Sequence, residues 1–444
     1  MMTTLQATSP LEKWLCYIEQ SHSKIIDMGL DRVKRVAQHL DLLRPAPFVI
    51  TVGGTNGKGT TCRLLEMLLL NAGYRVGVYS SPHLLRYNER VRIQGRELPD
   101  QQHTAAFYFL EQHKTESLSY FEFSTLSALY LFKQAELDIV ILEVGLGGRL
   151  DATNIVDADI SVITSIDIDH VDYLGDNLEQ IGYEKAGIFR SQKTAVIGEP
   201  DLPQSVGQYA RQIGSPLFCL GKEWSYRQTG QTWQWQSETV LRQQLPLPQI
   251  PLANAATALA VCCCLPFQIT PDNIVETLSQ VELSGRFQTI NTEQRQKLAH
   301  DWRLNESNLP QIIVDVGHNP HAARYLAQKL NQIKLQRNVK ITAVFAMLKD
   351  KDAVHVVEPL SDLIEQWIFA SLTGYRGQSA VELQAAVQPY LAPECQLKTQ
   401  TADSVTDGVR TALQTMSADE LLLIFGSFFT VAEFLALLQP KSAV

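Results

Sequence analysis

The stretch TVGGTNGKGTTCR, residues 51–63, comes close to the phosphate-binding loop G-x-x-x-x-G-K-[ST] without reproducing it. The usual loop has a hydroxyl residue directly after its lysine, whereas here Gly59 separates Lys58 from Thr60. An apolar run, PFVITVGG, leads into the stretch, and KGTTCRLLEMLLLNAG follows with the pattern of a helix. Glycine lets the backbone approach a phosphate, and the start of a helix offers free amides and a positive dipole end. This order of elements predicts a phosphate site; the alternative is a glycine-rich turn that binds nothing.

Short apolar runs alternate with helix-like segments over residues 47–200, which predicts an α/β fold with a parallel sheet flanked by helices. Strands are expected in PFVITVGG, YRVGVYSS, LDIVILEVG and ADISVITSI, with helices in KGTTCRLLEMLLLNAG and FSTLSALYLFKQAE. Because βαβ units place the carboxyl ends of their strands on one edge, the residues just after these strands should share a crevice. We therefore expect the chemistry at that edge.

A second alternation of strands and helices begins at Gln311 and continues almost to the end of the chain. The preceding stretch, NTEQRQKLAHDWRLNESNLP, is charged and polar without clear periodicity, so it reads as a linker. We expect an ATP-binding domain over residues 1–290, a linker over 291–310 and a smaller α/β domain over 311–444. The segment GKEWSYRQTGQTWQWQSETV alternates as antiparallel strands do. LLLIFGSFFTVAEFLALL reads as a buried strand that turns at Gly-Ser into a helix, not as a membrane span.

The composition narrows the class of protein further. The chain has 444 residues, 45% of them hydrophobic, which is enough for a large core and for two or three domains. A formal net charge of -9 gives no basic signature, so we do not expect nucleic acid as a partner. Seven cysteines, three of them consecutive at residues 262–264, match neither a disulfide framework nor a zinc site, so we expect buried reduced thiols. The start carries no apolar signal region, and we expect a cytoplasmic monomer with neither a nucleic-acid nor a membrane partner.

Two strand ends carry side chains that could bind a metal beside the phosphates. Glu143 ends LDIVILEVG, and His170 follows another strand in SIDIDHVDYLGD. Mg²⁺ bound to nucleotide phosphates keeps some water and takes few protein ligands, so a carboxylate at this edge suits it. Either Thr60 or Thr61 could reach the metal, and spacing does not decide between them. The alternatives are an ion pair between Glu143 and Arg149 and a histidine with a purely structural role.

Two further segments carry polar residues of interest. Taken by itself, Lys185 in EKAGIF reads as a solvated lysine in an ion pair with Glu184. Asp315, His318 and Asn319 in DVGHNPHAA follow a strand of the second domain and could close over a nucleotide. The residues alone therefore indicate a magnesium-dependent, ATP-using enzyme of two domains with a cleft between them. They do not identify the acceptor.

Eight segments together resemble a known family: GTNGKGT, SSPHLLRYNERVRI, LEVGLGGRLDATN, DHVDYLG, EKAGIFR, NAATAL, SGRFQ and DVGHNPHAA. They are similar to the bifunctional dihydrofolate synthase and folylpolyglutamate synthase branch of the Mur-ligase superfamily, in which a glycine also stands between the lysine and the threonine. The resemblance implies a P-loop, Mur-ligase-like central domain with a mainly parallel sheet and a smaller C-terminal α/β domain. It also implies an ATP-dependent amide ligase. ATP would convert a carboxylate of dihydropteroate or of a reduced folate into an acyl phosphate, which the amino group of L-glutamate then attacks.

The resemblance assigns roles to individual residues through the matching motifs. The residues implied to bind ATP are Gly54, Thr55, Asn56, Gly57, Lys58, Gly59, Thr60, Asn254, Arg286 and Asp315. The implied ligands of two magnesium ions are Ser81, Glu143, His170 and Lys185, the last as a carbamate formed with CO₂. The residues implied to bind the folate or glutamate are Asp27, Met28, Phe121, Glu122, Leu150, Asp151, Ala152 and Ser427. Catalytic roles fall to Lys58, Lys185 and His318.

The chain also departs from the family pattern. Gly317, Ser284 and Phe429 stand where alanine, proline and histidine are common, and the linker is long. A near alternative is a folylpolyglutamate synthase that cannot use dihydropteroate. A Mur-type cell-wall ligase fits less well because of Gly59 and the LDAT segment. An alternative of another class is a non-catalytic nucleotide-binding module.

Overall fold

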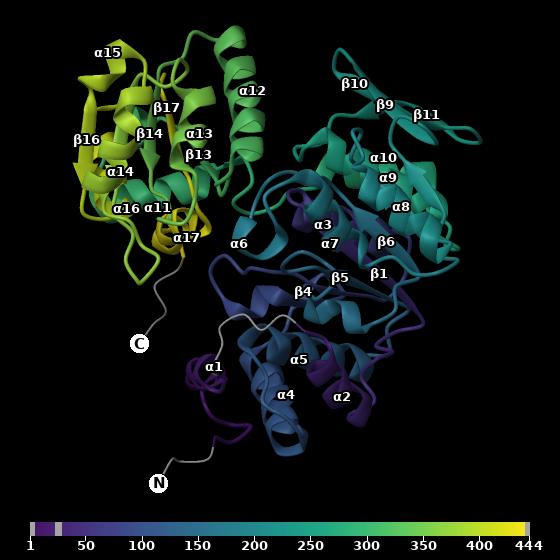
Figure 1. Cartoon of the computed structure of the whole chain (residues 1–444). Coiled ribbons are helices and arrows are strands. Elements are labelled where there is room, and N and C mark those ends of the chain that lie inside the picture. The colour runs from purple at the N-terminus through teal and green to yellow at the C-terminus, as the bar shows by residue number, and fades with distance from the viewer. Residues whose placement is uncertain (1–4, 23–28, 440–444) are drawn as a thin grey trace. The chain divides into compact units, whose positions relative to one another are not determined.

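The computed structural model describes residues 5–22 and 29–439, and the chain divides into two compact units, Met1–Val281 (unit 1) and Glu282–Val444 (unit 2) (Figure 1). The larger sheet belongs to unit 1 and has eight strands in the order β4-β3-β2-β5-β1-β6-β7-β8. Its strands are β1 (Phe48–Gly53), β2 (Val76–Tyr79), β3 (Val91–Ile93), β4 (Arg96–Glu97), β5 (Ile139–Glu143), β6 (Ile160–Ile163), β7 (Thr194–Ile197) and β8 (Leu217–Cys219). All pairs from β2 to β8 are parallel, while β3 and β4 join antiparallel at one edge. The parallel sheet expected from the alternation is confirmed.

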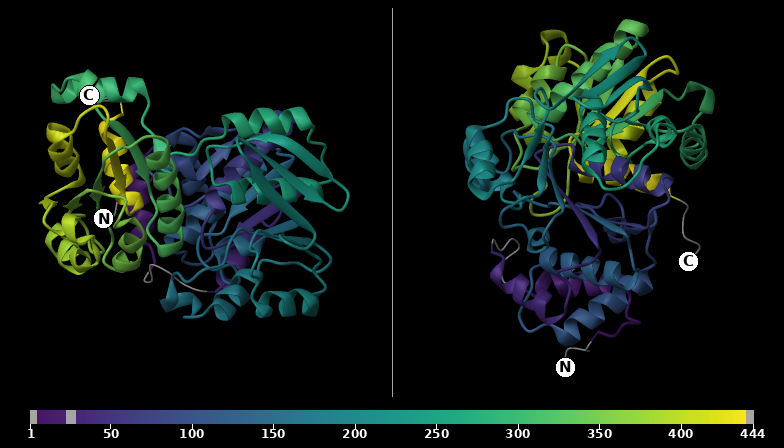
Figure 2. Two further views of the ribbon diagram at one scale, coloured as in Figure 1. Left: turned by 90° about the horizontal axis from the view of Figure 1, so that it is seen from above. Right: turned by 90° about the vertical axis from the view of Figure 1, so that its right-hand side faces the viewer.

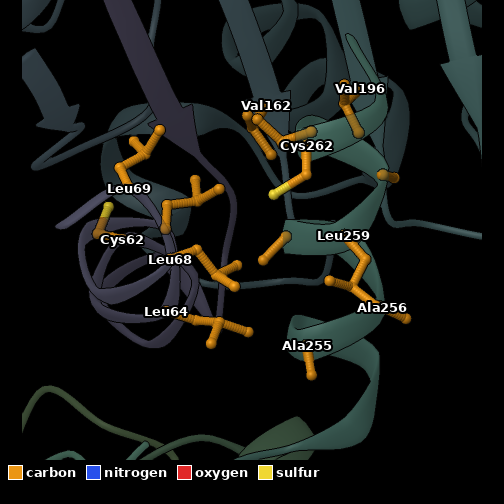
Figure 3. Packing of buried hydrophobic residues seen from close by; sticks show 14 of the residues in the cluster. Cys62, Leu64, Leu68, Leu69, Val162, Val196, Ala255, Ala256, Leu259 and Cys262 are labelled. Carbon is orange, nitrogen blue, oxygen red and sulfur yellow. The ribbon is translucent and has the colours of Figure 1, made fainter. Parts of the chain in front are cut away.

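The helices of unit 1 cover both faces of this sheet because its strands are apolar on both sides. They are α1 (Leu11–Gln20), α2 (Asp31–His39), α3 (Lys58–Asn71), α4 (Asp100–His113), α5 (Tyr120–Gln134), α6 (Val171–Leu174), α7 (Leu178–Ala186), α8 (Gln204–Ile213), α9 (Leu252–Cys264) and α10 (Pro271–Gln280). Helices α1, α2, α4 and α5 share one core. On the other face α3 and α9 pack together, with Leu64 and Leu68 directed toward Leu259 (Figure 3).

A smaller antiparallel sheet of three strands packs against the core that contains α9. It consists of β9 (Trp224–Thr229), β10 (Thr232–Ser237) and β11 (Leu241–Pro246), drawn in teal in Figure 2. Trp224, Trp233 and Trp235 are buried, and the Trp235 indole N–H donates to the carbonyl of Ala256 in α9. The antiparallel strands expected from the polar-aromatic alternation are confirmed.

Unit 2 has a six-stranded sheet in the order β12-β13-β17-β14-β15-β16. Its strands are β12 (Gln288–Thr289), β13 (Gln311–Asp315), β14 (Ile341–Phe345), β15 (Gln366–Ala370), β16 (Thr399–Ala402) and β17 (Leu421–Phe425). Its helices are α11 (Thr292–Trp302), α12 (Pro320–Gln336), α13 (Ala353–Val357), α14 (Ala380–Val387), α15 (Pro393–Gln396), α16 (Val405–Thr415) and α17 (Phe428–Leu437). Strand β17 is buried and turns at Gly426 and Ser427 into α17, as expected. Among the described residues, no helix is both long and apolar enough to cross a bilayer.

The predicted linker over residues 291–310 is wrong. Most of that stretch is α11, whose start is closed by a capping box between Asn291 and Gln294 and whose buried residues are Leu298 and Ala299. The residues before it also belong to unit 2, because β12 pairs antiparallel with β13. Two buried side chains in a charged helix give too weak a periodicity to be recognised in the sequence. The boundary between the units therefore follows Val281 rather than residue 290.

All seven cysteines lie in the described part of the chain, and all are free thiols. Cys62, Cys219, Cys262 and Cys395 are buried, while Cys16 is exposed. Burial raises the pKa of the Cys262 thiol, so it stays protonated and packs as a small apolar side chain. The thiols are free, as expected, but burial holds for only four of them: Cys263 and Cys264 are partly buried and Cys16 is exposed.

Candidate functional site

The phosphate-binding loop connects β1 to α3 and contains two glycines that no other residue could replace without rearrangement. Gly57, the N-cap of α3, has φ +85°, and a Cβ added there would lie 2.3 Å from Oδ1 of Asn254. Gly54 has φ +145°, and its added Cβ would lie 2.0 Å from Oγ1 of Thr164. The loop is therefore held tightly between the end of β6 and the start of α9. This contact brings Asn254 to the loop, as the resemblance implies.

Hydrogen bonds fix the loop to the segment that follows β6. The hydroxyl of Thr55 donates to the carbonyl of Asp167 at 3.0 Å, and the Asp167 N–H donates back to that hydroxyl at 3.0 Å. The N–H of Asn56 donates to the hydroxyl of Ser165 at 3.0 Å. Lys58 Nζ donates to the Gly54 carbonyl at 2.9 Å, so its ammonium group already lies over the loop that would receive phosphate.

Glu143 and Ser81 meet beside this loop. Glu143 is buried at the end of β5, and its Oε2 accepts a hydrogen bond from the Ser81 N–H at 3.2 Å. A Cβ added to Gly59 would lie 3.4 Å and 3.6 Å from the two oxygens of Glu143, so the inserted glycine faces that carboxylate directly. The ends of β1, β2 and β5 thus share one edge, as predicted. A carboxylate and a hydroxyl are oxygen donors of the kind that Mg²⁺ takes.

His170 lies on the same segment as the loop anchor Asp167, but it is more exposed than the other predicted ligands. It caps α6 with φ +54°, its side chain is 43% exposed, and its Nε2 lies 3.9 Å from Oδ2 of Asp169. Over the described ranges, no three His, Cys, Asp or Glu side chains gather closely enough to hold a metal by themselves. A metal there would need hydroxyl, phosphate or water oxygens as well, and the place of His170 among its ligands stays a prediction.

Lys185 is buried in α7, so the interpretation as a solvated lysine is wrong. Only 3% of the residue is exposed. Burial, helped by the positive charge of Lys58, lowers the pKa of Lys185 to about 7, and Asp169 opposes this only in part. Glu184, the expected partner, instead lies 3.9 Å from Arg149. A local helix pattern could not reveal this, because the burial comes from segments distant in sequence.

The segments implied to bind folate meet around Gly145. A Cβ added to Gly145 would lie 2.6 Å from the ring of Phe121, and the Gly145 N–H donates to Oδ2 of Asp151 at 3.0 Å. Ala152 is buried, whereas Leu150 is exposed. Asp27 and Met28, also implied for this site, lie outside the described residues.

Two carboxylates in this region already have internal partners. Asp151 also accepts hydrogen bonds from the Leu146 N–H at 2.9 Å and the Thr153 hydroxyl at 2.6 Å. Glu122 pairs with Arg32 at 2.7 Å and accepts from the Ser119 N–H at 2.7 Å, closing a capping box at the start of α5. Asp151 thus shapes the backbone at Gly145 and Glu122 the start of α5, whatever contact they make with a substrate.

Unit 2 carries the remaining predicted residues. Asp315 and His318 lie at the end of β13, Ser427 follows the neighbouring strand β17, and Arg286 lies just before β12. Asp315 is buried and accepts from the Gly317 N–H at 2.6 Å and the Phe287 N–H at 2.8 Å. Burial raises the pKa of Asp315, against the opposing charge of Arg286. Gly317 stands where alanine is common in the family. A Cβ at this position would lie only 2.7 Å from Oδ1 of Asp315, so the close approach of that carboxylate requires glycine.

The ring of Phe428 links two of the other residues in unit 2. The guanidinium carbon of Arg286 lies 5.3 Å from its centre, and the imidazole of His318 lies 6.1 Å from it, centre to centre. Ser427 is buried and caps α17 by accepting from the Thr430 N–H at 3.0 Å. Its hydroxyl is thus also a helix cap. Phe429, the third departure, is exposed.

Sequence reasoning missed a buried ion pair next to the metal-ligand candidates. Glu66 in α3 is completely buried and binds Arg92 of β3 as well as Arg63. A single carboxylate inside the apolar run RLLEMLLL could have revealed it, because a glutamate on the buried face of a helix needs a partner.

Family models place the chain in the Mur ligase class. Residues 52–223 match the Mur ligase middle domain, and residues 302–428 match the glutamate ligase domain of Mur ligases. The first match contains the phosphate loop, Glu143 and Lys185, and the second contains Asp315 and His318. The chain is therefore an ATP-dependent ligase of the Mur type.

Individual relatives narrow this class. A dihydrofolate synthase/folylpolyglutamate synthase of Haemophilus influenzae is 57% identical over 435 residues, covering 98% of this chain and 99% of the relative. The structure of Escherichia coli FolC with DHPP and ADP superimposes with a TM-score of 0.89 at 47% identity and covers 98% of each chain. A bifunctional folylpolyglutamate synthase/dihydrofolate synthase solved with Mn, AMPPNP and L-glutamate gives a TM-score of 0.87 at 48% identity, covering 98% of this chain and 99% of that one. The chain belongs to the dihydrofolate synthase/folylpolyglutamate synthase family, which confirms the resemblance and the fold class expected from the sequence.

Proposed function

We propose that this ligase joins L-glutamate to dihydropteroate, giving dihydrofolate, and to reduced folates, giving folylpolyglutamates. One observation carries the proposal: the phosphate loop, the Glu143–Ser81 pair and a buried lysine occur in one unit of a chain with a full-length, 57% identical relative of that name. Related structures bind the corresponding small molecules, DHPP and ADP in one case and AMPPNP and L-glutamate in another.

The reaction would take place in two displacements. A carboxylate oxygen of the acceptor attacks the γ-phosphorus of ATP, and the bond to the bridging oxygen breaks, releasing ADP and leaving an acyl phosphate. The neutral amine of glutamate then attacks the acyl carbon, phosphate leaves with its bonding electron pair, and the nitrogen loses a proton. Lys58 and the loop amides would hold the transferred phosphate and offset its charge.

Ser81, Glu143 and His170 would hold a magnesium ion, which when bound neutralises charge on the ATP phosphates. The hydrogen bond from the Ser81 N–H to the Glu143 carboxylate supports this assignment, because it holds the two residues together beside the loop. Two residues of unit 2, Arg286 and Asp315, would bind ATP. Ser427 would help to bind glutamate, and His318 would have a catalytic role.

Lys185 would supply a further metal ligand after reacting with CO₂. Only a neutral amine attacks CO₂, and with a pKa of about 7 roughly half of the Lys185 side chains are neutral at that pH. The nitrogen forms a bond to carbon and releases a proton, which gives a carbamate with two oxygens. A buried cation would thus become an anion suited to a second magnesium ion.

An acceptor assay tests the proposal. Purified full-length protein would be given ATP, Mg²⁺, bicarbonate and L-glutamate with either dihydropteroate or tetrahydrofolate monoglutamate. Glutamate addition to both acceptors is expected. Addition to the folate alone would favour the folylpolyglutamate synthase alternative, and ATP hydrolysis indifferent to both acceptors and to glutamate would favour the nucleotide-binding module. A cytoplasmic location and a monomeric state stay predictions of the sequence.

A further inference from the structure

Glu66 occupies a position where a carboxylate is costly. Its helix α3 presents Leu64, Leu65 and Leu68 to the core, all completely buried, and Glu66 is equally buried among them. A buried ion pair gains little over apolar side chains of the same volume, because both charges lose their water. The pair between Glu66 and Arg92 therefore needs an explanation beyond the stability of the fold.

Arg92 connects this carboxylate to the loop that follows β2. Its Nε lies 3.1 Å from each oxygen of Glu66, and its Nη2 lies 3.0 Å from Oε2. Its Nη1 reaches in another direction, donating to the Ser80 hydroxyl at 3.2 Å and to the Glu89 carbonyl at 3.3 Å. The planar guanidinium thus spans from α3 to the residue directly before Ser81.

Glu89 shapes the rest of the same loop. Its two carboxylate oxygens accept hydrogen bonds from the N–H groups of Leu84 at 2.6 Å, Leu85 at 2.6 Å and Arg86 at 2.8 Å. The hydrogen bonds of Glu89 therefore fold the loop between Ser80 and Glu89 into a compact turn, and Arg92 binds both ends of this loop. Movement of Arg92 would be transmitted to Ser81.

We propose that Arg92 is a positioning residue, which ties Ser81 to the helix that begins at Lys58 by bridging Glu66 and Ser80. The inference rests on the proposed function, because it takes Ser81 and Glu143 as ligands of the metal. Burial lowers the pKa of Arg92, but attraction to Glu66, with a smaller contribution from Glu143, raises it overall, so the bridge stays charged. Groups that orient a metal ligand typically change metal affinity when they are altered.

Three variants of the full-length protein separate this role from general stability. Arg92→Lys keeps the charge, but one ammonium group cannot bind Glu66 in the forked manner and also reach Ser80. Ser80→Ala removes only the arm toward the loop and introduces no charge. Arg63→Lys is the matched control, because Arg63 Nη1 binds the same Glu66 oxygen at 2.9 Å from within α3.

The readouts are the Mn²⁺ affinity of the complex with AMPPNP, measured by electron paramagnetic resonance, and the Mg²⁺ concentration that gives half-maximal activity. For Arg92→Lys and Ser80→Ala we expect the Mn²⁺ affinity to fall about tenfold and the half-maximal Mg²⁺ concentration to rise about tenfold. The kcat at saturating Mg²⁺ and the metal-free affinity for nucleotide should stay within about twofold of the wild type, because both variants act through the position of a metal ligand. Arg63→Lys should behave as the wild type.

Unchanged Mn²⁺ affinity in Ser80→Ala would overturn the inference, even if Arg92→Lys failed to fold. Equal weakening in Arg63→Lys would also overturn it, since the effect would then come from the Glu66 charge and not from the bridge to the loop. Failure of the wild-type complex itself to bind Mn²⁺ would be a separate result, which contradicts the metal site of the proposed function and the inference together.

Discussion

Lys185 is buried in α7, where its ammonium group lies near enough to the charge of Lys58 to be affected by it. Neighbouring Glu184 suggests an ordinary helical ion pair, yet the lysine is buried and its pKa falls to about 7 through burial and the nearby charge of Lys58. Such a lowered pKa in a buried lysine is typical of a reactive group.

Lys185→Ala should abolish ligase activity, by about 100-fold or more, because it removes the proposed carbamate beside the transferred phosphate. Added bicarbonate should not restore it, since no amine remains to react. The assay is glutamate addition, together with the ¹³C NMR signal of protein equilibrated with labelled bicarbonate. Lys193→Ala, which removes an exposed lysine paired with Asp159 at 2.8 Å, serves as the control. Normal activity of Lys185→Ala would exclude the carbamate role.

A second single residue, His103, makes the stability of the fold depend on pH. It is completely buried in α4 against the rings of Tyr87 and Phe107, and neither ring nitrogen has a partner within the described residues. Burial lowers the pKa of His103 to about 4, although Asp100 opposes the shift. Between pH 6.5 and pH 4 the His103 side chain is protonated in the unfolded chain but stays neutral in the folded chain. The free energy of unfolding therefore falls as the pH drops from 6.5 to 4.

His103→Leu should therefore flatten the pH profile of unfolding. Between pH 7 and pH 5 the wild type should lose about 2 kcal/mol more unfolding free energy than the variant. Urea titrations at a series of pH values measure this difference. As a control, replacing exposed His39 by leucine should leave the dependence of unfolding free energy on pH as it is in the wild type. Equal pH dependence in the wild type and His103→Leu would contradict the assignment.

The strand, loop and helix from β1 to α3 act as one element of the nucleotide site. Gly57 combines a positive φ with close contact to Asn254, so the backbone turn and the side chain from α9 depend on each other. Gly73, just after the other end of α3, has nearly the same φ, +88°, but nothing lies within 4 Å of an added Cβ.

Gly57→Ala and Gly73→Ala should therefore have different effects. Both place Cβ in a left-handed conformation, which costs about 1–2 kcal/mol of stability. Only Gly57→Ala also displaces Asn254, and its affinity for ATP should fall at least tenfold, or about 1.4 kcal/mol. Isothermal titration with ATP and urea unfolding separate the two effects. Equal ATP affinities in both variants would show that the contact with Asn254 does not matter.

At the scale of the whole molecule, the boundary between the units decides which residues fold together. Residues 282–290 supply β12 and buried Ile290 to the sheet of unit 2, and the N–H of Phe287 to the carboxylate of Asp315. A cut at residue 291 would leave that carboxylate with one backbone donor fewer.

A fragment of residues 282–444 should thus be more stable than one of residues 291–444. The loss of one donor to a buried carboxylate costs about 1–3 kcal/mol, in addition to the lost strand pairing. Urea unfolding followed by circular dichroism compares the two fragments. Equal unfolding free energies would restore the boundary expected from the sequence.

The alternation of strands and helices, the phosphate loop and the edge that carries Glu143 could be predicted from local sequence patterns, whereas the family and the role of Ser81 came from the resemblance of whole motifs. The first three features follow from local backbone preferences, hydrophobic periodicity and the rule that parallel strands end on one side. Three features became visible only in the folded chain: residues 291–310 contain a helix of unit 2, Lys185 is buried, and Arg92 joins Glu66 to Ser80. Burial, pKa values and such bridges depend on side chains brought together from distant parts of the chain, and no local pattern encodes them.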